Sequence, residues 1–348
     1  MDPTAVNTNV TIDDWDSILN YANPADWQTP DPQSPPLATV LPTTPWLDGT
    51  YHQTGVVNAS ITLDFQGPAI YVFGASGPTY GSYAVSIDGV ETTYSAYATS
   101  NATTPHLLYG NGALAYSSHT LQLRNLGAAQ ASDQGASAFL LDFILATVQL
   151  GPAGATITNT TVEDNDPKLK YSGTWTEESG PLFSGGTSIY TNTNSSVSLT
   201  FNGTALYIFG DTVNNHGEYS VTIDNHQPQT YNSIRGCGGA FGKFCEKTQP
   251  SLRYFAGNLD SSEHTVTVTN IAINSTFIDL DRFVYTTPSQ YAPITTSLNS
   301  SAAATTSSAS SSSSTQKASS APGMFDRSPL LLLFIGAFWF LRLGRARA

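Results

Sequence analysis

Two clusters of carboxylates are the densest groups of potential metal ligands in this sequence. They are Asp13, Asp14 and Asp16 near the start of the chain and Glu163, Asp164 and Asp166 further on. Calcium takes about six to eight oxygen ligands, which carboxylates and turn carbonyls can supply. The same acids could instead cap turns and solvate the first residues of a domain. Both interpretations stay open at this point.

Catalytic sets are harder to find in the sequence. A glycosidase needs two carboxyls set about 5 Å or about 6.5–9.5 Å apart. The paired candidates, Asp88 and Asp224, each stand at a strand end before a turn residue, where aspartate is common for local reasons. No G-x-S-x-G motif is present, and His119 and His264 directly precede strands, as turn or edge residues do. We therefore predict that the chain is not an enzyme.

Loop aromatic residues are the better candidates for recognising a ligand. Exposed rings offer a face on which a sugar can stack, while polar neighbours bind its hydroxyls. The candidates are Trp46, Tyr51, Tyr80, His216, Tyr231 and Arg235. Each of them could also be a packing residue. Tyr83 and Tyr219 alternate with core residues along a strand and are expected to be structural.

An internal duplication organises these residues. Ser60–Gly89 and Ser196–Asn225 align without a gap at an offset of 136, and 13 of 30 positions are identical. Three shorter blocks keep the same order at offsets of 150, 145 and 139. A repeat of this length is a domain rather than a solenoid unit. We expect one domain over residues 9–150 and a second over residues 159–287.

The repeated blocks show the period of strands rather than helices. Apolar residues alternate in Ile61, Leu63 and Phe65, as a half-buried strand requires. AIYVFG and ALYIFG are continuous apolar runs that end in glycine, which is typical of a strand covered on both faces. The sequence therefore predicts an all-β fold of two tandem antiparallel β-sandwich domains.

These blocks resemble known ectodomains. The strand order and the closing blocks LLDFILAT and DLDRFVYT look like galactose-binding-like jelly rolls, a superfamily that includes many carbohydrate-binding modules. The acidic openings, the block FNGTALYIFG and the Ser-rich stalk resemble tandem ectodomains of uncharacterised membrane-anchored surface proteins of basidiomycete fungi. The resemblance implies a calcium ion between the opening segment and the last strand. Its ligands would be Asp14, Asp16 and Asp142 in the first copy and Asp164, Asp166 and Asp281 in the second.

The C-terminal region predicts a tethered protein. Residues 288–327 form a Ser/Thr-rich stalk without hydrophobic periodicity, which we expect to be disordered. A short apolar helix with a basic tail is expected at 328–348, and its run Leu330–Leu341 would span only about 18 Å. It fits either a glycolipid-anchor signal or a single-pass helix stopped by arginines, and both stay open.

The two kinds of targeting signal disagree about location. The start, MDPTAVNTNVTIDDW, shows no signal peptide, which would suit a cytosolic or tail-anchored chain. Glycosylation sequons favour an extracellular chain whose signal is missing from this sequence. They are Asn9, Asn58, Asn101, Asn159, Asn194, Asn202, Asn274 and Asn299. Cys237 and Cys245, eight residues apart in a glycine-rich segment, are expected to form a disulfide in that environment.

Composition also favours an extracellular surface protein. Charged residues make up 11% of the chain, so Ser, Thr, Asn and Gln must cover its surface. With 26 acidic and 13 basic residues the net charge is −13, which argues against nucleic-acid binding. The preferred function is a non-enzymatic cell-surface module that binds glycan or cell-wall polysaccharide or mediates adhesion. The alternatives are a structural or sensor ectodomain with a protein partner, and a cryptic glycan-active enzyme.

Overall fold

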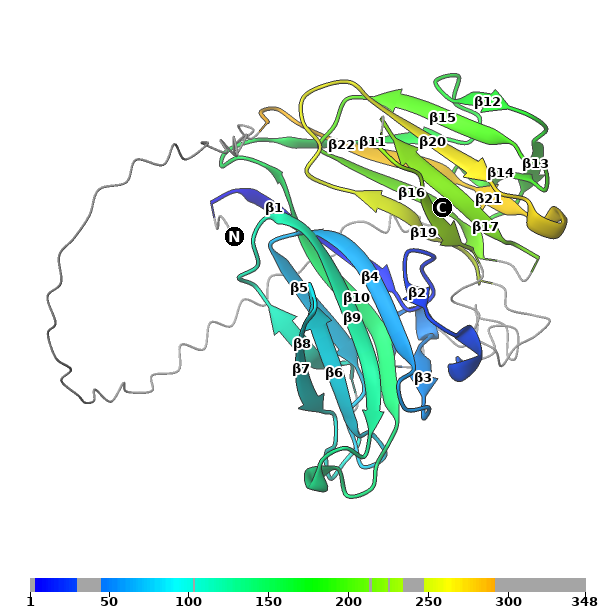
Figure 1. The fold of residues 1–348 in the computed structure, drawn as a ribbon. Helices are drawn as coiled ribbons and strands as arrows, with labels where there is room; N and C mark the ends of the chain where they lie inside the picture. Colours follow the sequence, from blue (N-terminus) through cyan, green and yellow to red (C-terminus); the bar gives the residue numbers. More distant parts are fainter. Residues whose placement is uncertain are drawn as a thin grey trace, which may run out of the picture. The chain divides into compact units, whose positions relative to one another are not determined.

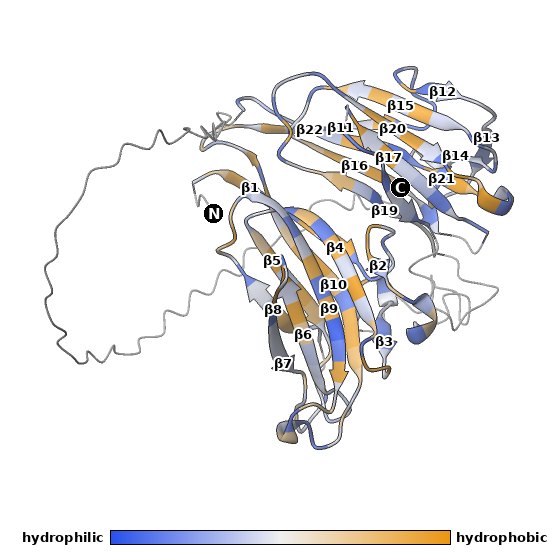
Figure 2. Cartoon of the chain, in the orientation of Figure 1, coloured by the Kyte–Doolittle hydropathy of each residue, from blue (hydrophilic) through white to orange (hydrophobic). Residues whose placement is uncertain are grey.

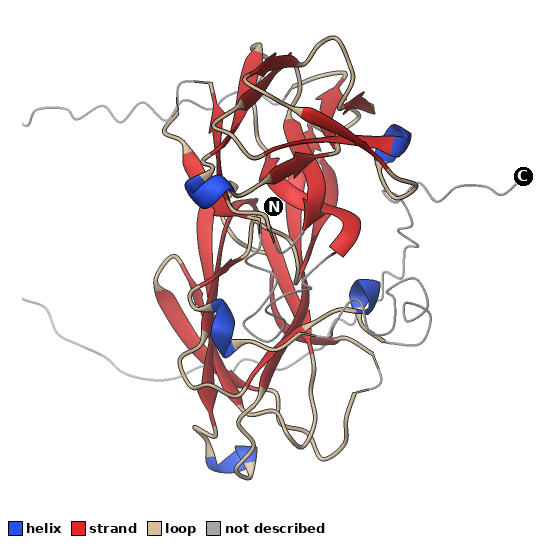
Figure 3. Cartoon of the chain, turned by 90° about the vertical axis from the view of Figure 1, so that its right-hand side faces the viewer, coloured by secondary structure: helices blue, strands red, loops and turns tan. Residues whose placement is uncertain are grey.

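A computed structural model of the chain describes residues 4–29, 45–102, 104–212, 215–224, 226–233 and 247–291, with the backbone alone at 247–250. Strands are the main regular secondary structure of these residues (Figure 1). The helices among them are three-residue 3₁₀ turns, drawn in blue in Figure 3. The prediction of an all-β fold built from antiparallel sheets is confirmed.

The first half of the chain forms two sheets. One has the strand order β1-β10-β5-β8, with β3 also paired to β10, and the other has the order β2-β4-β9-β6-β7. The elements are β1 (Val6–Asp13), β2 (Asn20–Tyr21), η1 (Pro24–Asp26), η2 (Leu47–Gly49), β3 (His52–Thr54), β4 (Ser60–Gly67), β5 (Ala69–Gly74), β6 (Ser82–Ile87), β7 (Val90–Ser95), β8 (His106–Asn111), β9 (Ser117–Gly127), η3 (Ala131–Asp133) and β10 (Phe139–Gly151).

The second half repeats the strand order of the two main sheets and places its remaining strands in a third, smaller sheet. Its sheets have the orders β11-β22-β16-β19 and β12-β15-β20-β17-β18, and a third sheet has the order β13-β14-β21. Thus β16 stands where β5 stands, and β19 where β8 stands. The elements are β11 (Ile157–Glu163), β12 (Lys170–Ser172), β13 (Thr176–Ser179), η4 (Ser184–Gly186), β14 (Thr187–Thr191), β15 (Ser196–Phe201), β16 (Ala205–Thr212), β17 (Glu218–Ile223), β18 (Gln229–Asn232), β19 (Lys247–Ala256), β20 (His264–Asn270), η6 (Ile273–Ser275), β21 (Ile278–Leu280) and β22 (Arg282–Pro288).

The cores are built from the alternating apolar residues of the two sheets. In the first half, Ile61 and Leu63 of β4 share a buried cluster with Ile70 and Val72 of β5. The alternation shows in Figure 2 as orange and blue bands along the strands. Each such side chain stabilises the fold by about 1.5–3 kcal/mol when it is fully buried. These packed strands therefore fix the positions of the polar side chains that line the pocket described below.

Candidate functional site

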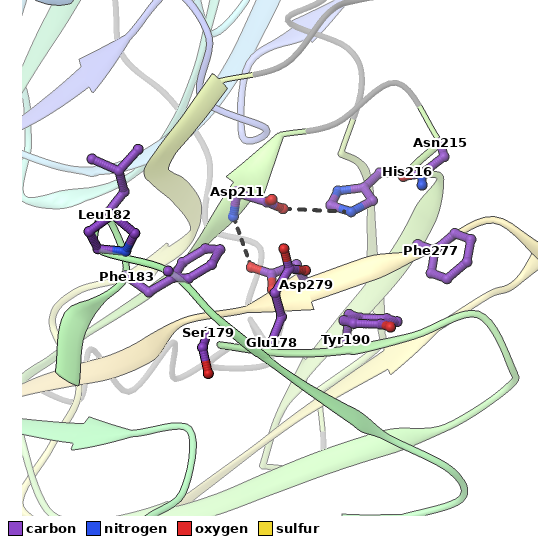
Figure 4. Close-up of a pocket in the computed structure, with 12 residues that line it drawn as sticks. Glu178, Ser179, Leu182, Phe183, Tyr190, Asp211, Asn215, His216, Phe277 and Asp279 are labelled. Atoms are coloured by element: carbon purple, nitrogen blue, oxygen red, sulfur yellow. Dashed lines mark hydrogen bonds and ion pairs between the residues drawn. The ribbon is translucent and has the colours of Figure 1, made fainter. Parts of the chain in front are cut away.

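A pocket of about 520 Å³ lies in the second half, where β13, β14, β16 and β21 meet (Figure 4). Acidic side chains, a histidine and aromatic rings line it together. The lining residues are Glu178, Ser179, Gly180, Pro181, Leu182, Phe183, Tyr190, Asp211, Asn215, His216, Phe277 and Asp279. Small-ligand sites usually measure about 300–1,000 Å³, so this pocket has room for a sugar-sized ligand.

Asp279 of β21 is the most deeply buried acid of the pocket, with 2% of its surface exposed. Its Oδ1 accepts the backbone N–H of Asp211 at 3.0 Å. Within the described chain its Oδ2 has no hydrogen bond of normal geometry, although the Ser188 hydroxyl lies close. Burial raises the pKa of Asp279 and the charge of Glu178 adds to the rise, while Ser188, the Asp211 N–H and Arg253 oppose it. The carboxyl is therefore held towards its protonated form.

Arg253, His216 and Asp211 form a buried polar unit beside this acid. Arg253 is fully buried, and it donates to the Asp211 carbonyl and, at 3.2 Å, to Nδ1 of His216. Because a guanidinium can only donate, Nδ1 is the acceptor and the ring proton lies on Nε2. That nitrogen faces Oδ1 of Asp211 at 3.6 Å (Figure 4). Burial and the charge of Arg253 lower the pKa of His216, so the imidazole is neutral.

Two glycines show which residues of the first half correspond to this unit. Gly74 of β5 and Gly210 of β16 occupy the same place in the two halves. At each of them a Cβ would collide with the backbone carbonyl of one residue and with the side chain of another, so the contacting residues can be matched between the halves. The facing residues are Leu140 and Leu108 in the first half and Asp279 and Arg253 in the second. The alignment of the repeats adds two more pairs, Ala75 with Asp211 and Tyr80 with His216.

The polar unit is therefore confined to the second half. The backbone pairing is alike at this point of both halves, since the isolated bridge between Tyr80 and Ala138 has its counterpart between His216 and Phe277. The side chains differ: Ala becomes Asp, Tyr becomes His, one Leu becomes Arg and the other Leu becomes Asp. Burying an ionic group where apolar packing would serve usually costs stability. A buried polar cluster at the wall of a pocket makes this half the candidate functional site.

Polar contacts present in both halves have a structural role by the same reasoning. Asp88 and Asp224 each end a strand in the left-handed backbone region, with φ of 52°. Each carboxylate binds Nδ1 of the histidine that follows in the fold, at 2.7 Å in His119 and 2.8 Å in His264. These two repeated pairs fix a turn against the next strand. The acids are turn residues as expected, whereas His119 and His264 lie within β9 and β20 rather than before them.

The structure brings three of the predicted ligand-binding residues together in the first half. The rings of Trp46 and Tyr51 lie 5.7 Å apart at an angle of 64°. Tyr80 lies near Tyr51, and burial and this neighbour raise the pKa of Tyr80. His216 lies in the pocket of the second half, at the position that corresponds to Tyr80.

Of the other two predicted ligand-binding residues, Tyr231 lies elsewhere in the second half. Tyr231 of β18 packs its ring 5.6 Å from that of Tyr219 and 5.9 Å from that of Tyr254. It is not among the residues that line the pocket. Arg235 lies outside the described residues, as do Cys237 and Cys245 of the predicted disulfide.

The carboxylates predicted to bind calcium all accept hydrogen bonds from the chain. Their donors are Thr50 for Asp14, the N–H groups of Asp13 and Leu252 for Asp16, that of Leu47 for Asp142, Thr187 for Asp164, the N–H of Lys168 for Asp166 and that of Ser184 for Asp281. Burial raises the pKa of Asp142 to about 8 and that of Asp281 to about 7. No set of three or more His, Cys, Asp or Glu side chains in the described ranges is arranged to hold a metal. Calcium binding stays a prediction from the sequence.

The predicted tether also lies outside the described residues, which end at Tyr291. This applies to most of the stalk, to the apolar segment at 328–348 and to the sequon at Asn299. No helix in the described part of the chain is long and apolar enough to cross a membrane. The other seven sequon asparagines are all exposed.

Sequence reasoning found His216 but missed four residues of this site. They are Glu178, Asp211, Arg253 and Asp279. A signal existed for Asp211, which stands opposite Ala75 in the gap-free alignment of the repeats. Asp279 stands opposite Leu140 in the closing block. Comparing the two copies for changes from apolar to charged residues would have found both.

Comparison with known proteins adds one informative relative. No family model matches the chain. The "A type blood alpha-D-galactosamine galactosaminidase" of Flavonifractor plautii is 35% identical over 127 residues, which is 36% of this chain and 11% of that protein. The chain therefore spans about a tenth of the length of this curated relative.

Solved structures that the chain partly matches have much lower similarity. A Paenibacillus xanthan lyase is 17% identical over 70% of this chain and 24% of that one, with a TM-score of 0.27. A family two carbohydrate esterase from Cellvibrio japonicus is 20% identical over 40% of this chain and 37% of the esterase, with a TM-score of 0.29. An exo-beta-1,3-galactanase from Phanerochaete chrysosporium is 15% identical over 41% and 37%, with a TM-score of 0.27. Overlaps this low support no conclusion about function.

The curated relative overturns the prediction that the chain is not an enzyme. That prediction depended on the turn positions of Asp88 and Asp224, on the absence of a G-x-S-x-G motif and on the positions of the histidines. The relative is named as a galactosaminidase. The pocket of the second half gathers Glu178, Asp211 and Asp279, which lie far apart in the sequence and come together only through the sheet.

Proposed function

We propose that this protein is a glycan-active enzyme and that the pocket of the second half is its active site. One observation carries the proposal. A buried unit of Asp211, His216, Arg253 and Asp279 replaces apolar residues of the first half, and it does so at the wall of a sugar-sized pocket. The galactosaminidase relative supports glycan chemistry as the class of reaction.

The residues of the pocket can divide the work of glycoside hydrolysis. Asp279, buried and held towards its protonated form, is the general acid that gives its proton to the glycosidic oxygen as the C–O bond breaks. Glu178, exposed at the rim, is the carboxylate that takes a proton from the attacking water, whose oxygen bonds to the anomeric carbon. Tyr190 and Phe183 offer ring faces for the sugar.

Release of the aryl alcohol from aryl glycosides tests this proposal. The full chain is incubated with aryl derivatives of galactose, galactosamine and N-acetylgalactosamine. We expect cleavage of at least one, slowed about 10²- to 10⁴-fold by Asp279→Asn. Asp142→Asn is the matched control, because it alters another buried carboxyl with a raised pKa that lies outside the pocket. Absence of cleavage, or equal activity in Asp279→Asn, would refute the assignment.

We also propose that the enzyme acts at a cell surface. The exposed sequon asparagines, the Ser/Thr-rich stalk and the apolar segment at 328–348 support this location. Expression of the chain behind a secretion signal, followed by enzymatic removal of N-glycans, would show a mass loss on gels. An unchanged mass would count against the extracellular location.

A further inference from the structure

A second cavity, of about 640 Å³, lies where the first half of the chain meets the second. Residues of β4 and β9 line one side of it, and residues of β17, β18 and β19 line the other. It shares no lining residue with the candidate active site. Its volume falls in the range of about 300–1,000 Å³ that is usual for small-ligand sites. The cavity therefore has room for a ligand, and both halves are needed to form it.

Buried contacts between the halves hold the two walls of this cavity in place. The carboxylate of Asp16 accepts the backbone N–H of Leu252, on β19, at 2.8 Å, and both residues are buried. Leu252 belongs to the same hydrophobic cluster as Val148 of the first half. A Cβ on Gly257, which lines the cavity, would lie 3.7 Å from the Val148 side chain. Because these contacts are close-packed, the cavity is preformed.

The lining combines aromatic rings with uncharged hydrogen-bonding groups. Tyr231, which the sequence predicted to bind a ligand, lines this cavity together with Phe255. The amide side chains of Gln66, Gln227 and Gln229 belong to the same lining. Rings that stack on sugar faces and amides that bind sugar hydroxyls are the usual contacts of a carbohydrate site.

Packing within the second half positions the Tyr231 ring. The ring packs on Tyr219 and Tyr254, and the first half repeats this trio with Tyr83, Tyr94 and Tyr109. The repeated contacts have a structural role, so the ring is held firmly at the cavity wall. Oε1 of Gln229 accepts the Tyr231 hydroxyl at 3.1 Å, which leaves the NH₂ group of this amide to donate to a ligand.

The charges of the lining select against an acidic ligand. Within the described chain it holds no lysine or arginine, the side chains that usually pair with carboxylate and sulfate groups. Its carboxylates are those of Asp64, which accepts the Thr120 hydroxyl at 2.7 Å, and Asp88, which binds His119 at 2.7 Å. An acidic sugar would meet these carboxylates without a strong basic partner, whereas an uncharged sugar would bind through its hydroxyls.

We propose that the cavity at the junction of the halves binds a stretch of uncharged glycan chain, as a second site separate from the candidate active site. Gln66 binds the chain from the first half and Gln229 from the second, while the Tyr231 ring offers a face to a sugar. The inference goes beyond the proposed hydrolysis, because binding here uses none of the residues assigned to catalysis. A second contact on the same polysaccharide raises the effective concentration of substrate at the enzyme.

Affinity electrophoresis of the full chain tests the inference without needing turnover. Each native gel contains one polysaccharide: a neutral β-1,3-glucan, β-1,3-galactan or β-1,4-mannan, or the acidic polygalacturonate. We expect at least one neutral polysaccharide to retard the protein and polygalacturonate to leave its migration unchanged. Unchanged migration in all three neutral gels, or retardation by polygalacturonate as strong as by a neutral chain, would overturn the proposal.

Three glutamines on strands provide matched variants. Gln66 of β4 and Gln229 of β18 line the cavity from different halves, and Gln122 of β9 lies outside it. We expect Gln66→Ala and Gln229→Ala each to weaken binding about fivefold, because each removes a hydrogen-bonding amide, and Gln122→Ala to leave binding unchanged. An effect of Gln229→Ala without one of Gln66→Ala would place the site on the second half alone and refute a site at the junction.

A variant of the proposed general acid separates the two sites. We expect Asp279→Asn to slow the cleavage of aryl glycosides while retardation in the gel persists. Loss of retardation in Asp279→Asn but not in Gln66→Ala would place binding at the candidate active site and refute the second site. Retardation without cleavage of any aryl glycoside would leave this inference standing and refute the enzyme.

Discussion

Replacing Arg253 should show whether the buried polar unit of Asp211, His216, Arg253 and Asp279 stabilises or destabilises the fold. The first half shows which side chains an apolar version would use, namely Ala75, Tyr80, Leu108 and Leu140. Two variants follow from this template. One changes Arg253→Leu alone. The other makes Asp211→Ala, His216→Tyr, Arg253→Leu and Asp279→Leu together.

The single variant removes the buried guanidinium that lies against these acids. Arg253 is fully buried and Asp211 and Asp279 are nearly so, which means that water cannot replace the lost partner. Removing one member of a buried ionic group typically costs about 3–5 kcal/mol. Replacing the whole group by well-packed apolar residues is often neutral or stabilising by about 1–4 kcal/mol. The fourfold variant should therefore be more stable than the single one.

Urea unfolding of the full chain measures both changes. We expect the single variant to lose about 3–5 kcal/mol and the fourfold variant to unfold within about 1 kcal/mol of the native chain, or later. Strong non-additivity is the signature of a coupled unit. A single variant of unchanged stability, or a fourfold variant as unstable as the sum of its parts, would refute the reasoning.

Three further predictions concern pH, packing and metal. Because the pKa values of Asp142 and Asp281, about 8 and about 7, lie above the unfolded value of 3.8, the folded chain keeps protons that the unfolded chain loses. The free energy of unfolding should fall as pH rises from about 4 to 8, by up to about 1.4 kcal/mol per pH unit for each group. In a series of thermal melts over this pH range, Asp142→Asn should weaken the fall in melting temperature, most clearly between about pH 7 and 8. Gly210→Ala should destabilise the fold by about 1–3 kcal/mol, because the new Cβ would collide with the backbone carbonyl of Asp279. Gly55→Ala is the control, since a Cβ at Gly55 would contact no atom within 4 Å. Equal melting temperatures of the two variants would contradict this prediction. If the acidic openings bind calcium, a calcium concentration about 100 times the dissociation constant should stabilise the chain by about 2.7 kcal/mol. An unchanged melting curve would exclude such a site.

The fold was predictable because its signals are local and appear twice. The alternation in Ile61, Leu63 and Phe65 reports a buried face within a few residues, and the second copy repeats it. The site was less predictable because it depends on strand pairing. Asp211 and Asp279 are 68 residues apart and meet only when β21 places its backbone against the end of β16.

Residues with a repeated local role were easier to interpret than those without one. Asp88 and Asp224 follow a turn pattern that the sequence displays directly, and the structure shows both bound to a histidine. Arg253 falls outside the aligned blocks, and its correspondence to Leu108 emerges only from β19 and β8 in three dimensions. Tyr231 illustrates the opposite case, since a tyrosine in a polar segment gives no sign of the rings that it packs against.

The most direct test of the account is a hydrogen-exchange footprint of the full chain with bound galactose, galactosamine or N-acetylgalactosamine. Binding in the second-half pocket predicts slower exchange in segments 178–183 and 215–216, with no change at 46–51 and 79–81 of the first half. Protection confined to the first half, or spread equally over both, would contradict the claim that the polar unit marks the active copy.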